Sequence, residues 1–152
     1  MKPFSVIDDR IEPIGRVRFV LTGLDGEVKQ DFEVPNLVPN LGKGAIAERM
    51  KAAPAIAAMS HMAVGTGNNG PGPADSQLVA EIGRVALAGT VVAAAVITYT
   101  AVFGPGVGTG ALQEAGIFNA GAAGVLLART IYATINKAAG DTLNVTWTVT
   151  IG

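Results

Sequence analysis

The stretch Thr142-Leu-Asn-Val-Thr-Trp-Thr-Val-Thr-Ile151 decides the fold class of this chain. Over its ten residues, a threonine or asparagine alternates with an apolar residue at every position. Successive side chains of a β-strand point to opposite faces of the sheet, so this alternation predicts a half-buried antiparallel strand. Trp147 is then expected in the core, on the inward face of the strand together with Val145 and Val149.

The rest of the sequence predicts further strands around this one. Residues 91–103 and 125–135 are expected to be its partners, and the weakly polar run 86–104 indicates a long strand rather than a membrane span. Residues 15–21 alternate charged and apolar side chains, and residues 28–34 form the return strand after the Asp25-Gly26 turn. Short strands with glycine-rich turns predict a mainly β chain, an antiparallel β-sandwich with an N-terminal β-hairpin.

One segment has a helical pattern. Asn40 stands where a helix N-cap is expected, ahead of residues 41–51, and Pro54 follows the segment. We therefore expect one short α-helix, and a further short turn of helix through residues 78–82, capped by Asp75-Ser76. The domain assignment is an N-terminal arm over residues 1–14 and a single β-sandwich domain over 15–152, with hairpin and helix in 15–53 and the sandwich in 59–152.

Charge is distributed unevenly along the sequence. The net charge is −1, which argues against a nucleic-acid partner bound through a basic face. Residues 1–85 contain 19 charged side chains, and residues 86–152 contain four: Glu114, Arg129, Lys137 and Asp141. Water-facing surfaces normally mix both signs of charge, whereas interface cores are depleted of it. We predict that the second half is buried within an assembly; the alternative is a surface of Thr, Asn and Gly.

No motif carries catalytic chemistry. There is no cysteine, and the single histidine, His61, is expected to be a packed side chain with one satisfied nitrogen. Residues 65–70 read GxGxxG, but Pro71-Gly-Pro73 follows where a nucleotide site needs a helix N-terminus. Glu114 is expected to pair with Arg129 across strands. We therefore assign no catalytic, cofactor-binding or metal residues and no cofactor, and we predict that the protein is not an enzyme.

Several short stretches follow one another in a specific order. They are residues 61–67 (HMAVGTG), 78–84 (LVAEIGR), 98–103 (TYTAVF), 108–119 (GTGALQEAGIFN), 127–130 (LART) and 136–149 (NKAAGDTLNVTWTV). In this order they resemble a β-sandwich module of tailed-bacteriophage structural proteins, found in trimeric capsid decoration ("cement") proteins and at the distal ends of tail fibres and tailspikes. Residues 25–26 and 36–43 resemble the lead-in of such proteins. The resemblance covers residues 15–151 and implies no catalytic residues.

The resemblance implies a virion structural protein, made in the host cytoplasm, that binds the outer capsid surface as a homotrimer and stabilises the shell. Its expected partners are its own copies and the major capsid protein, with a host-surface glycan as a further candidate and neither nucleic acid nor membrane. The N-terminal arm and the first hairpin are expected to contact the shell. The alternative is a tail-fibre or tailspike tip for host-surface recognition. These 152 residues contain no shaft repeats, which favours decoration.

Overall fold

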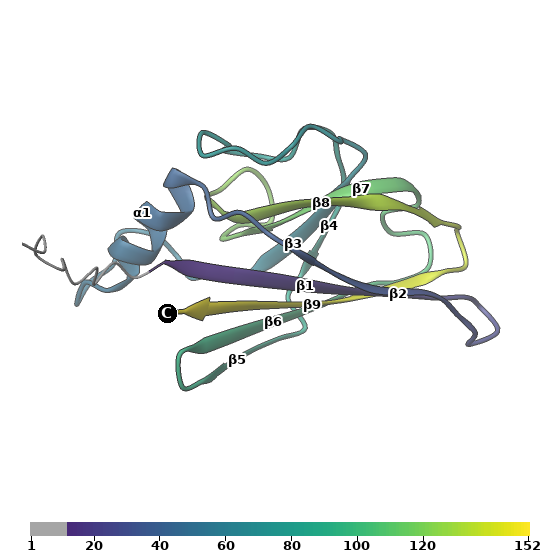
Figure 1. Ribbon diagram of the computed structural model, residues 1–152, viewed down its shortest axis with the longest axis horizontal. Coiled ribbons are helices and arrows are strands. Elements are labelled where there is room, and N and C mark those ends of the chain that lie inside the picture. Colours follow the sequence, from purple (N-terminus) through teal and green to yellow (C-terminus); the bar gives the residue numbers. More distant parts are fainter. Residues whose placement is uncertain (1–11) are drawn as a thin grey trace, which may run out of the picture.

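The computed structural model describes residues 12–152, which form nine strands and one helix (Figure 1). In chain order the elements are β1 (Pro13–Thr22), β2 (Val28–Pro35), α1 (Asn40–Arg49), β3 (His61–Gly65), β4 (Glu81–Ala86), β5 (Gly89–Ala93), β6 (Val96–Phe103), β7 (Gly110–Phe118), β8 (Leu126–Lys137) and β9 (Thr142–Ile151).

The strands form two antiparallel sheets that face each other across one core. One sheet has five strands in the order β2-β1-β9-β6-β5, and the other has four in the order β4-β3-β7-β8. The helix α1 lies at one end of the two layers (Figure 1). The prediction of a mainly β, antiparallel β-sandwich with an N-terminal hairpin and one short α-helix is therefore confirmed.

The alternating strand that predicted the fold lies at the centre of the larger sheet. β9 pairs with β1 on one side and with β6 on the other, and Trp147 faces Val17 and Tyr99 in these neighbours. Trp147 is fully buried, and Val145 and Val149 are buried on the same face, as predicted. One face of β9 packs in the core and the other faces solvent, which explains the alternation along the strand.

Of the two predicted partners of β9, one is right in part and the other is wrong. Residues 91–103 are not one strand, because the chain reverses at Ala94, with φ at +51°, and forms the β5–β6 hairpin. No glycine, asparagine or proline marks this turn in the sequence. Residues 125–135 do not pair with β9, because β8 belongs to the other sheet and pairs with β7. Of the two expected partners, only the β6 part of 91–103 lies beside β9.

The helix is confirmed, but its start differs from the prediction. α1 begins at Asn40 itself, the N-cap position is Pro39, and no side chain caps the helix. The backbone N–H of Asn40 instead donates to the carbonyl of Pro73 at 2.9 Å, which links the helix start to the long loop that precedes β4. α1 ends at Arg49, ahead of Pro54.

The second predicted helical turn is absent, since residues 78–80 lead directly into the strand β4, which begins at Glu81. Asp75 caps no helix there. Its carboxylate accepts the N–H of Gly72 and pairs with Arg129. The Asp75 carboxylate thus contacts its own loop and β8, where the prediction expected a helix cap.

The sheet begins within the predicted N-terminal arm. β1 starts at Pro13, which lies opposite Ile151, so residues 13 and 14 are part of the five-stranded sheet. Residues 1–11 of the predicted arm lie outside the described residues. The first hairpin is the edge of this same sheet, because β1 pairs with both β2 and β9.

Candidate functional site

The most buried polar cluster is centred on Glu114 of β7. Its side chain is fully buried, and Oε2 accepts hydrogen bonds from Nε and Nη2 of Arg129 at 3.1 and 2.9 Å. Arg129 lies on the neighbouring strand β8, diagonally displaced from Glu114 in the register. The predicted pairing of these two residues across strands is therefore confirmed.

The same carboxylate also binds three backbone amides of the loop formed by residues 66–80. The N–H groups of Gly67 and Ala80 donate to Oε1 at 3.1 and 2.7 Å, and that of Val79 donates to Oε2 at 2.9 Å. Glu114 thus accepts five hydrogen bonds, and its lone pairs are occupied. A general base needs a free lone pair directed at a substrate, so this carboxylate has a structural role.

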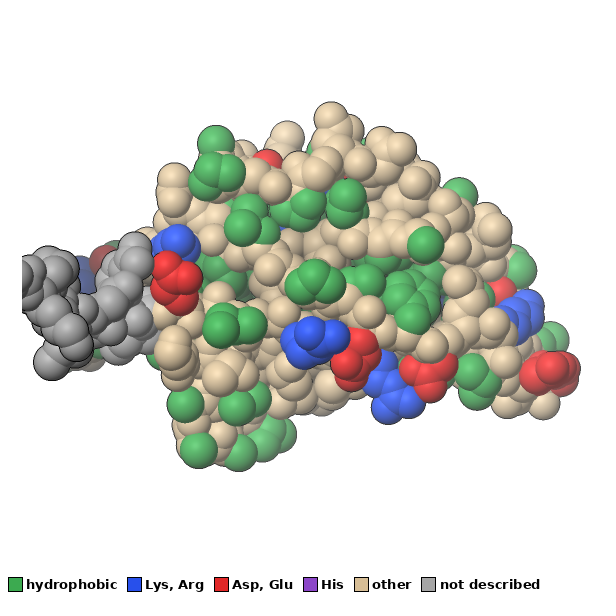
Figure 2. Space-filling view, viewed as in Figure 1, with side chains coloured by type: hydrophobic (Ala, Val, Ile, Leu, Met, Phe, Trp, Pro, Cys, Tyr) green, Lys and Arg blue, Asp and Glu red, His purple; other side chains and the backbone are tan. Residues whose placement is uncertain are grey.

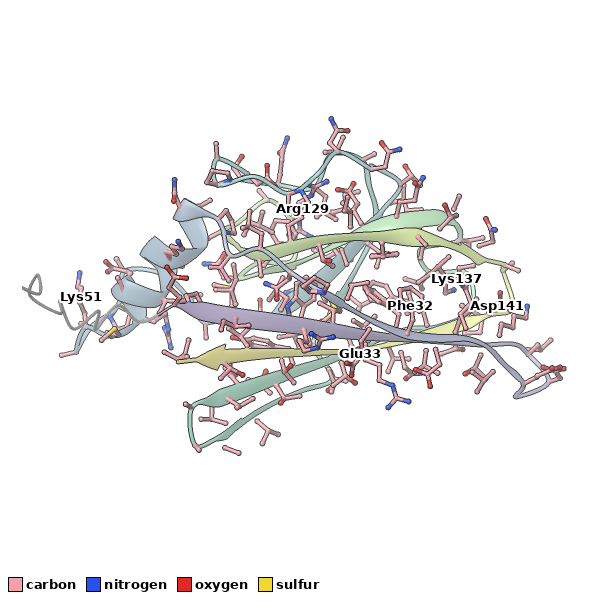
Figure 3. The ribbon with its side chains drawn as sticks, in the orientation of Figure 1. Phe32, Glu33, Lys51, Arg129, Lys137 and Asp141 are labelled. Atoms are coloured by element: carbon pink, nitrogen blue, oxygen red, sulfur yellow. The ribbon has the colours of Figure 1, made fainter. Side chains whose placement is uncertain are left out.

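Arg129 holds the same loop at a second position, Asp75. Its Nη1 lies 3.2 Å from Oδ2 of Asp75, while the hydroxyl of Tyr132 donates to the backbone carbonyl of Glu114 at 2.8 Å. Burial, together with the nearby carboxylate, raises the pKa of Tyr132. Figure 3 shows Arg129 between β8 and the overlying loop. The ion pair with Asp75 and the amide bonds to Glu114 hold the loop against the sheet, while Tyr132 fixes the backbone of β7 beneath it.

The 66–80 loop covers the outer face of the smaller sheet. Leu78 packs in a cluster with Ala63, Phe118 and Leu126, and the loop runs above β7 and β8 in Figure 1. A Cβ at Gly116 would lie 2.9 Å from Leu78, so this glycine permits the close approach. Both faces of the sheet are consequently buried over most of β3, the second half of β7 and the first half of β8, one against the larger sheet and one against this loop.

The geometry of this loop also shows what the glycines of the GxGxxG pattern in residues 65–70 do in the structure. No helix follows it in the structure, and the amide of Gly67 already donates to the carboxylate of Glu114. An added Cβ at Gly67 would approach that carboxylate to 2.6 Å. A phosphate group cannot share this position with a buried carboxylate, because the two anions repel each other. The glycines therefore serve close packing here.

His61 lies at the start of β3 and is half-buried. Its Nδ1 is 2.8 Å from the hydroxyl oxygen of Ser60, so one ring nitrogen is hydrogen-bonded, as predicted. Within residues 12–152, no group of three or more His, Asp or Glu side chains gathers as metal ligands would.

The four charged residues of the second half are all inside the protein. Glu114, Arg129, Lys137 and Asp141 are at most 2% exposed. Lys137 donates to the carbonyl of Gly104 at 2.8 Å, and Asp141 pairs with Lys29 of β2 at 2.7 Å, at the end of the molecule opposite α1 (Figure 3). Residues 86–152 therefore present a surface without any charged side chain. The sequence indicated few charges in this half; their complete burial depends on contacts that pattern cannot reveal.

The outer face of the five-stranded sheet is divided into a charged and an uncharged half. On β1 and β2, Arg16 pairs with Glu33 at 3.4 Å and Arg18 pairs with Asp31 at 2.7 Å. These pairs form the charged strip near the centre of Figure 2. The remaining three strands present uncharged side chains, namely Asn144, Thr146 and Thr148 on β9, Thr98, Thr100 and Val102 on β6, and Val91 and Ala93 on β5.

An apolar cavity of about 400 Å³ opens at the end of the molecule that carries α1, and its lining includes the charged residue Arg49. It lies between α1 and the inner side of the β5–β6 hairpin. Its lining includes Ala45, Ile46, Met59, Val92, Ile97 and Ile151. We refer to this space below as the apolar cavity.

A second hollow, of about 380 Å³, lies between residues 76–78 and the loop of residues 121–124. Arg84 lies in its wall, 3.8 Å above the ring of Phe118, and donates to the carbonyls of Ala120 and Ala123. Its other nitrogens bind Glu81. The guanidinium of Arg84 in this hollow is thus hydrogen-bonded to other groups of the protein.

No family model, curated protein or solved structure matches this chain. The resemblance to phage decoration modules therefore stays a prediction. Along residues 12–152, no helix combines the length and the apolar character that crossing a membrane requires.

Proposed function

We propose that the protein is a virion structural protein that binds the outer surface of a phage capsid as a homotrimer and stabilises the shell. The observation that carries this proposal is the uncharged surface of residues 86–152. Surfaces that stay in water normally mix charges of both signs, and interface cores lose them. A surface of this kind is suited to permanent contact with other subunits.

The charged half of the sheet supplies a second surface of different chemistry. The Arg16–Glu33 and Arg18–Asp31 pairs are exposed, and both strands that carry them lie next to the start of the described chain. Mixed charges of this kind fit the polar rim of an interface better than its core. We place the shell contact here and on the N-terminal arm, so that one surface binds the capsid and the other binds the sister copies.

Three copies on one particle strengthen a weak single contact. When one copy is bound, the others are held near their own sites, and the assembly leaves only when all contacts are broken together.

The aromatic residues favour decoration over glycan recognition at a tail tip. Every aromatic ring within residues 12–152 is buried or half-buried. Small-ligand sites are concave and lined mainly by hydrophobic and aromatic groups, and the hollow beside Phe118 has that ring covered by Arg84. The described surface thus offers a sugar no open aromatic platform.

Binding to purified particles tests this function. Recombinant protein is mixed with capsids that lack it and with isolated tails, and each mixture is sedimented and imaged by electron microscopy. Density of three-fold symmetry on the outer shell, together with a capsid that withstands higher temperature, supports decoration. Binding to tails alone supports the tail-fibre or tailspike alternative, and binding to neither contradicts both.

A further inference from the structure

The apolar cavity and the β5–β6 hairpin form one continuous surface. Three elements line the cavity together: the hairpin through Val92, Ala94, Ala95 and Val96, α1 through Ile46, and β9 through Ile151. Val92 is 68% exposed, and Figure 2 shows hydrophobic side chains gathered over this hairpin at lower left. A contiguous apolar surface that is open to solvent usually marks a site where something else packs.

The turn of the hairpin keeps this lining apolar at a conformational cost. Ala94 adopts φ of +51°, a region that favours glycine or asparagine. Asparagine at this position would bring a polar amide to the cavity, and glycine would remove a methyl group from its lining. A residue kept in a disfavoured conformation is a pointer to function, and here it points to an apolar occupant.

The described chain begins beside the same cavity. The backbone carbonyl of Glu12 accepts the N–H of Gly152 at 3.4 Å, and Pro13 lies opposite Ile151 in the sheet. Ile151 lines the cavity, and its N–H donates at 2.9 Å to the carbonyl of Ala95, which lines the cavity as well. Residues 1–11 are therefore joined to the protein at the edge of this lining.

The sequence of that segment matches the chemistry of the cavity. It contains the apolar residues Phe4, Val6 and Ile7, followed directly by the acidic pair Asp8-Asp9. The cavity combines an apolar lining with the guanidinium of Arg49. Arg49 donates to the carbonyl of Ile56 at 3.1 Å, and no carboxylate of residues 12–152 pairs with it. An apolar run followed by acidic residues complements both parts of this surface.

The length of the segment is sufficient. An extended chain advances about 3.3 Å per residue, so Ile7 reaches up to about 17 Å from Glu12. The cavity lies along the strands β9, β6 and β5, which are neighbours in the sheet and span about 10 Å at the usual strand spacing. A segment tethered at the edge of its site has an effective concentration in the millimolar range, which favours it over any separate molecule at micromolar concentration.

We infer that residues 4–7 of the N-terminal segment pack into the apolar cavity of their own copy and place Asp8 and Asp9 beside Arg49. This contact goes beyond the proposed function, because it belongs to the free chain and does not depend on what the protein binds. It is compatible with the shell contact proposed above, since a docked segment holds its basic residues, Lys2 and Arg10, at a fixed place on the surface.

Cysteine cross-linking of the full chain tests the contact. The chain has no cysteine, so an introduced pair is the only one present. The test variant combines Val6→Cys with Ile46→Cys, which lies in the cavity lining. The matched control combines Val6→Cys with Ala47→Cys, the next residue of α1, which is more exposed and does not line the cavity. Random encounters would favour the exposed control position, whereas docking favours Ile46.

Non-reducing gels under mild oxidation separate the outcomes. We expect the test variant to form an internal disulfide, seen as a mobility shift of the single chain, much faster than the control does. Equal rates, a faster control or no cross-link in either variant would overturn the contact. Covalent multimers of the test variant would show that the segment enters the cavity of another copy, which also overturns the inference as stated.

A dye that binds exposed apolar surface gives a second readout that needs no change in the cavity. Anilinonaphthalene sulfonate should bind weakly to the full chain and give several-fold higher fluorescence with a chain that lacks residues 2–11. Ile7→Asp should raise the fluorescence in the same way, and the control Lys2→Asp should not. Circular dichroism checks that each variant is folded. Equal fluorescence of the full and shortened chains overturns the inference. Neither experiment contains capsids, so failure to bind capsids overturns the proposed function alone.

Discussion

The guanidinium of Arg129 lies 2.9 Å from the carboxylate of Glu114, and both side chains are buried. The pair joins β7 to β8, but its larger effect is on the loop of residues 66–80, which has three amides bound to the same carboxylate. Burying two charges is favourable only when all their hydrogen-bonding groups are satisfied. Because the Glu114 carboxylate accepts hydrogen bonds from Arg129 and from the three amides, these two charges can be buried under the loop.

Removing the charge of Glu114 should destabilise the protein strongly. Glu114→Gln leaves the Arg129 guanidinium buried with only Asp75 as an anionic partner and turns an amide NH₂ toward backbone donors. We expect a loss of about 3–5 kcal/mol in the free energy of unfolding, the usual cost of breaking a buried pair. Urea unfolding measures it. The control is Asp31→Asn in the exposed Arg18–Asp31 pair, which should leave stability nearly unchanged. Equal effects of the two variants would contradict the structural role of Glu114.

Truncating the central aromatic residue should be similarly costly. Trp147 is fully buried in the middle of β9, so Trp147→Ala should lower the free energy of unfolding by ~3–5 kcal/mol. Its indole N–H has no hydrogen-bond partner, so Trp147→Phe loses volume but no hydrogen bond and should cost clearly less. Thermal or urea unfolding of both variants provides the test. A phenylalanine variant as unstable as the alanine variant would contradict this ordering.

The Lys29–Asp141 pair should make stability sensitive to acid. The hydrogen bond from Lys29, together with that from the Ala138 amide, lowers the pKa of Asp141 below its ordinary value. A lowered carboxyl pKa stabilises the folded state at pH above the ordinary value, and this contribution is lost as the pH falls through the lowered pKa.

Asp141→Asn should therefore melt at a lower temperature than the wild type at pH 7, and the difference should shrink as the solution is acidified below the ordinary aspartate range. Scanning calorimetry over a pH series measures both curves. A difference that stays constant to strongly acidic pH would show that the charge of Asp141 is unimportant.

Deleting residues 2–11 should abolish attachment to capsids and leave the trimer folded. The deletion stops before Pro13, so β1 and its pairing with β9 stay intact. The reason is that the proposed shell contact includes this segment, whereas the proposed contact between copies uses the uncharged surface of residues 86–152. Co-sedimentation with undecorated capsids tests attachment, and the mass in solution is the control. Truncated trimers that bind as tightly as the intact protein would exclude the arm as the anchor.

The features that follow from local pattern were predictable from the sequence. The alternation over residues 142–151 places Trp147 inside, and Asp25-Gly26 marks the first hairpin because its residues accept the turn conformation. The β5–β6 hairpin was not predicted because its turn consists of alanines. The residues Ala93-Ala-Ala95 contain no turn residue, so the sequence did not show that the backbone reverses at Ala94.

The features that depend on distant segments were only partly predictable. The pairing of Glu114 with Arg129 followed from two opposite charges in an uncharged region on adjacent strands. The three amides of the 66–80 loop did not, because backbone groups leave no trace in the sequence. Asp75 indicated a helix cap because capping is a local pattern, whereas its partner Arg129 is 54 residues away in the sequence.

The fastening of residues 66–80 has a consequence for how the protein resists digestion. Long glycine- and proline-rich loops are ordinarily the first segments that proteases cut. Here the loop can open only if the buried Glu114 carboxylate loses its three amide donors, Arg129 loses Asp75, and Leu78 leaves its cluster. The free energy of such local opening should approach that of global unfolding. The amide hydrogens of Gly67, Val79 and Ala80 should then exchange with deuterium about as slowly as those of the central strands, although they belong to a loop.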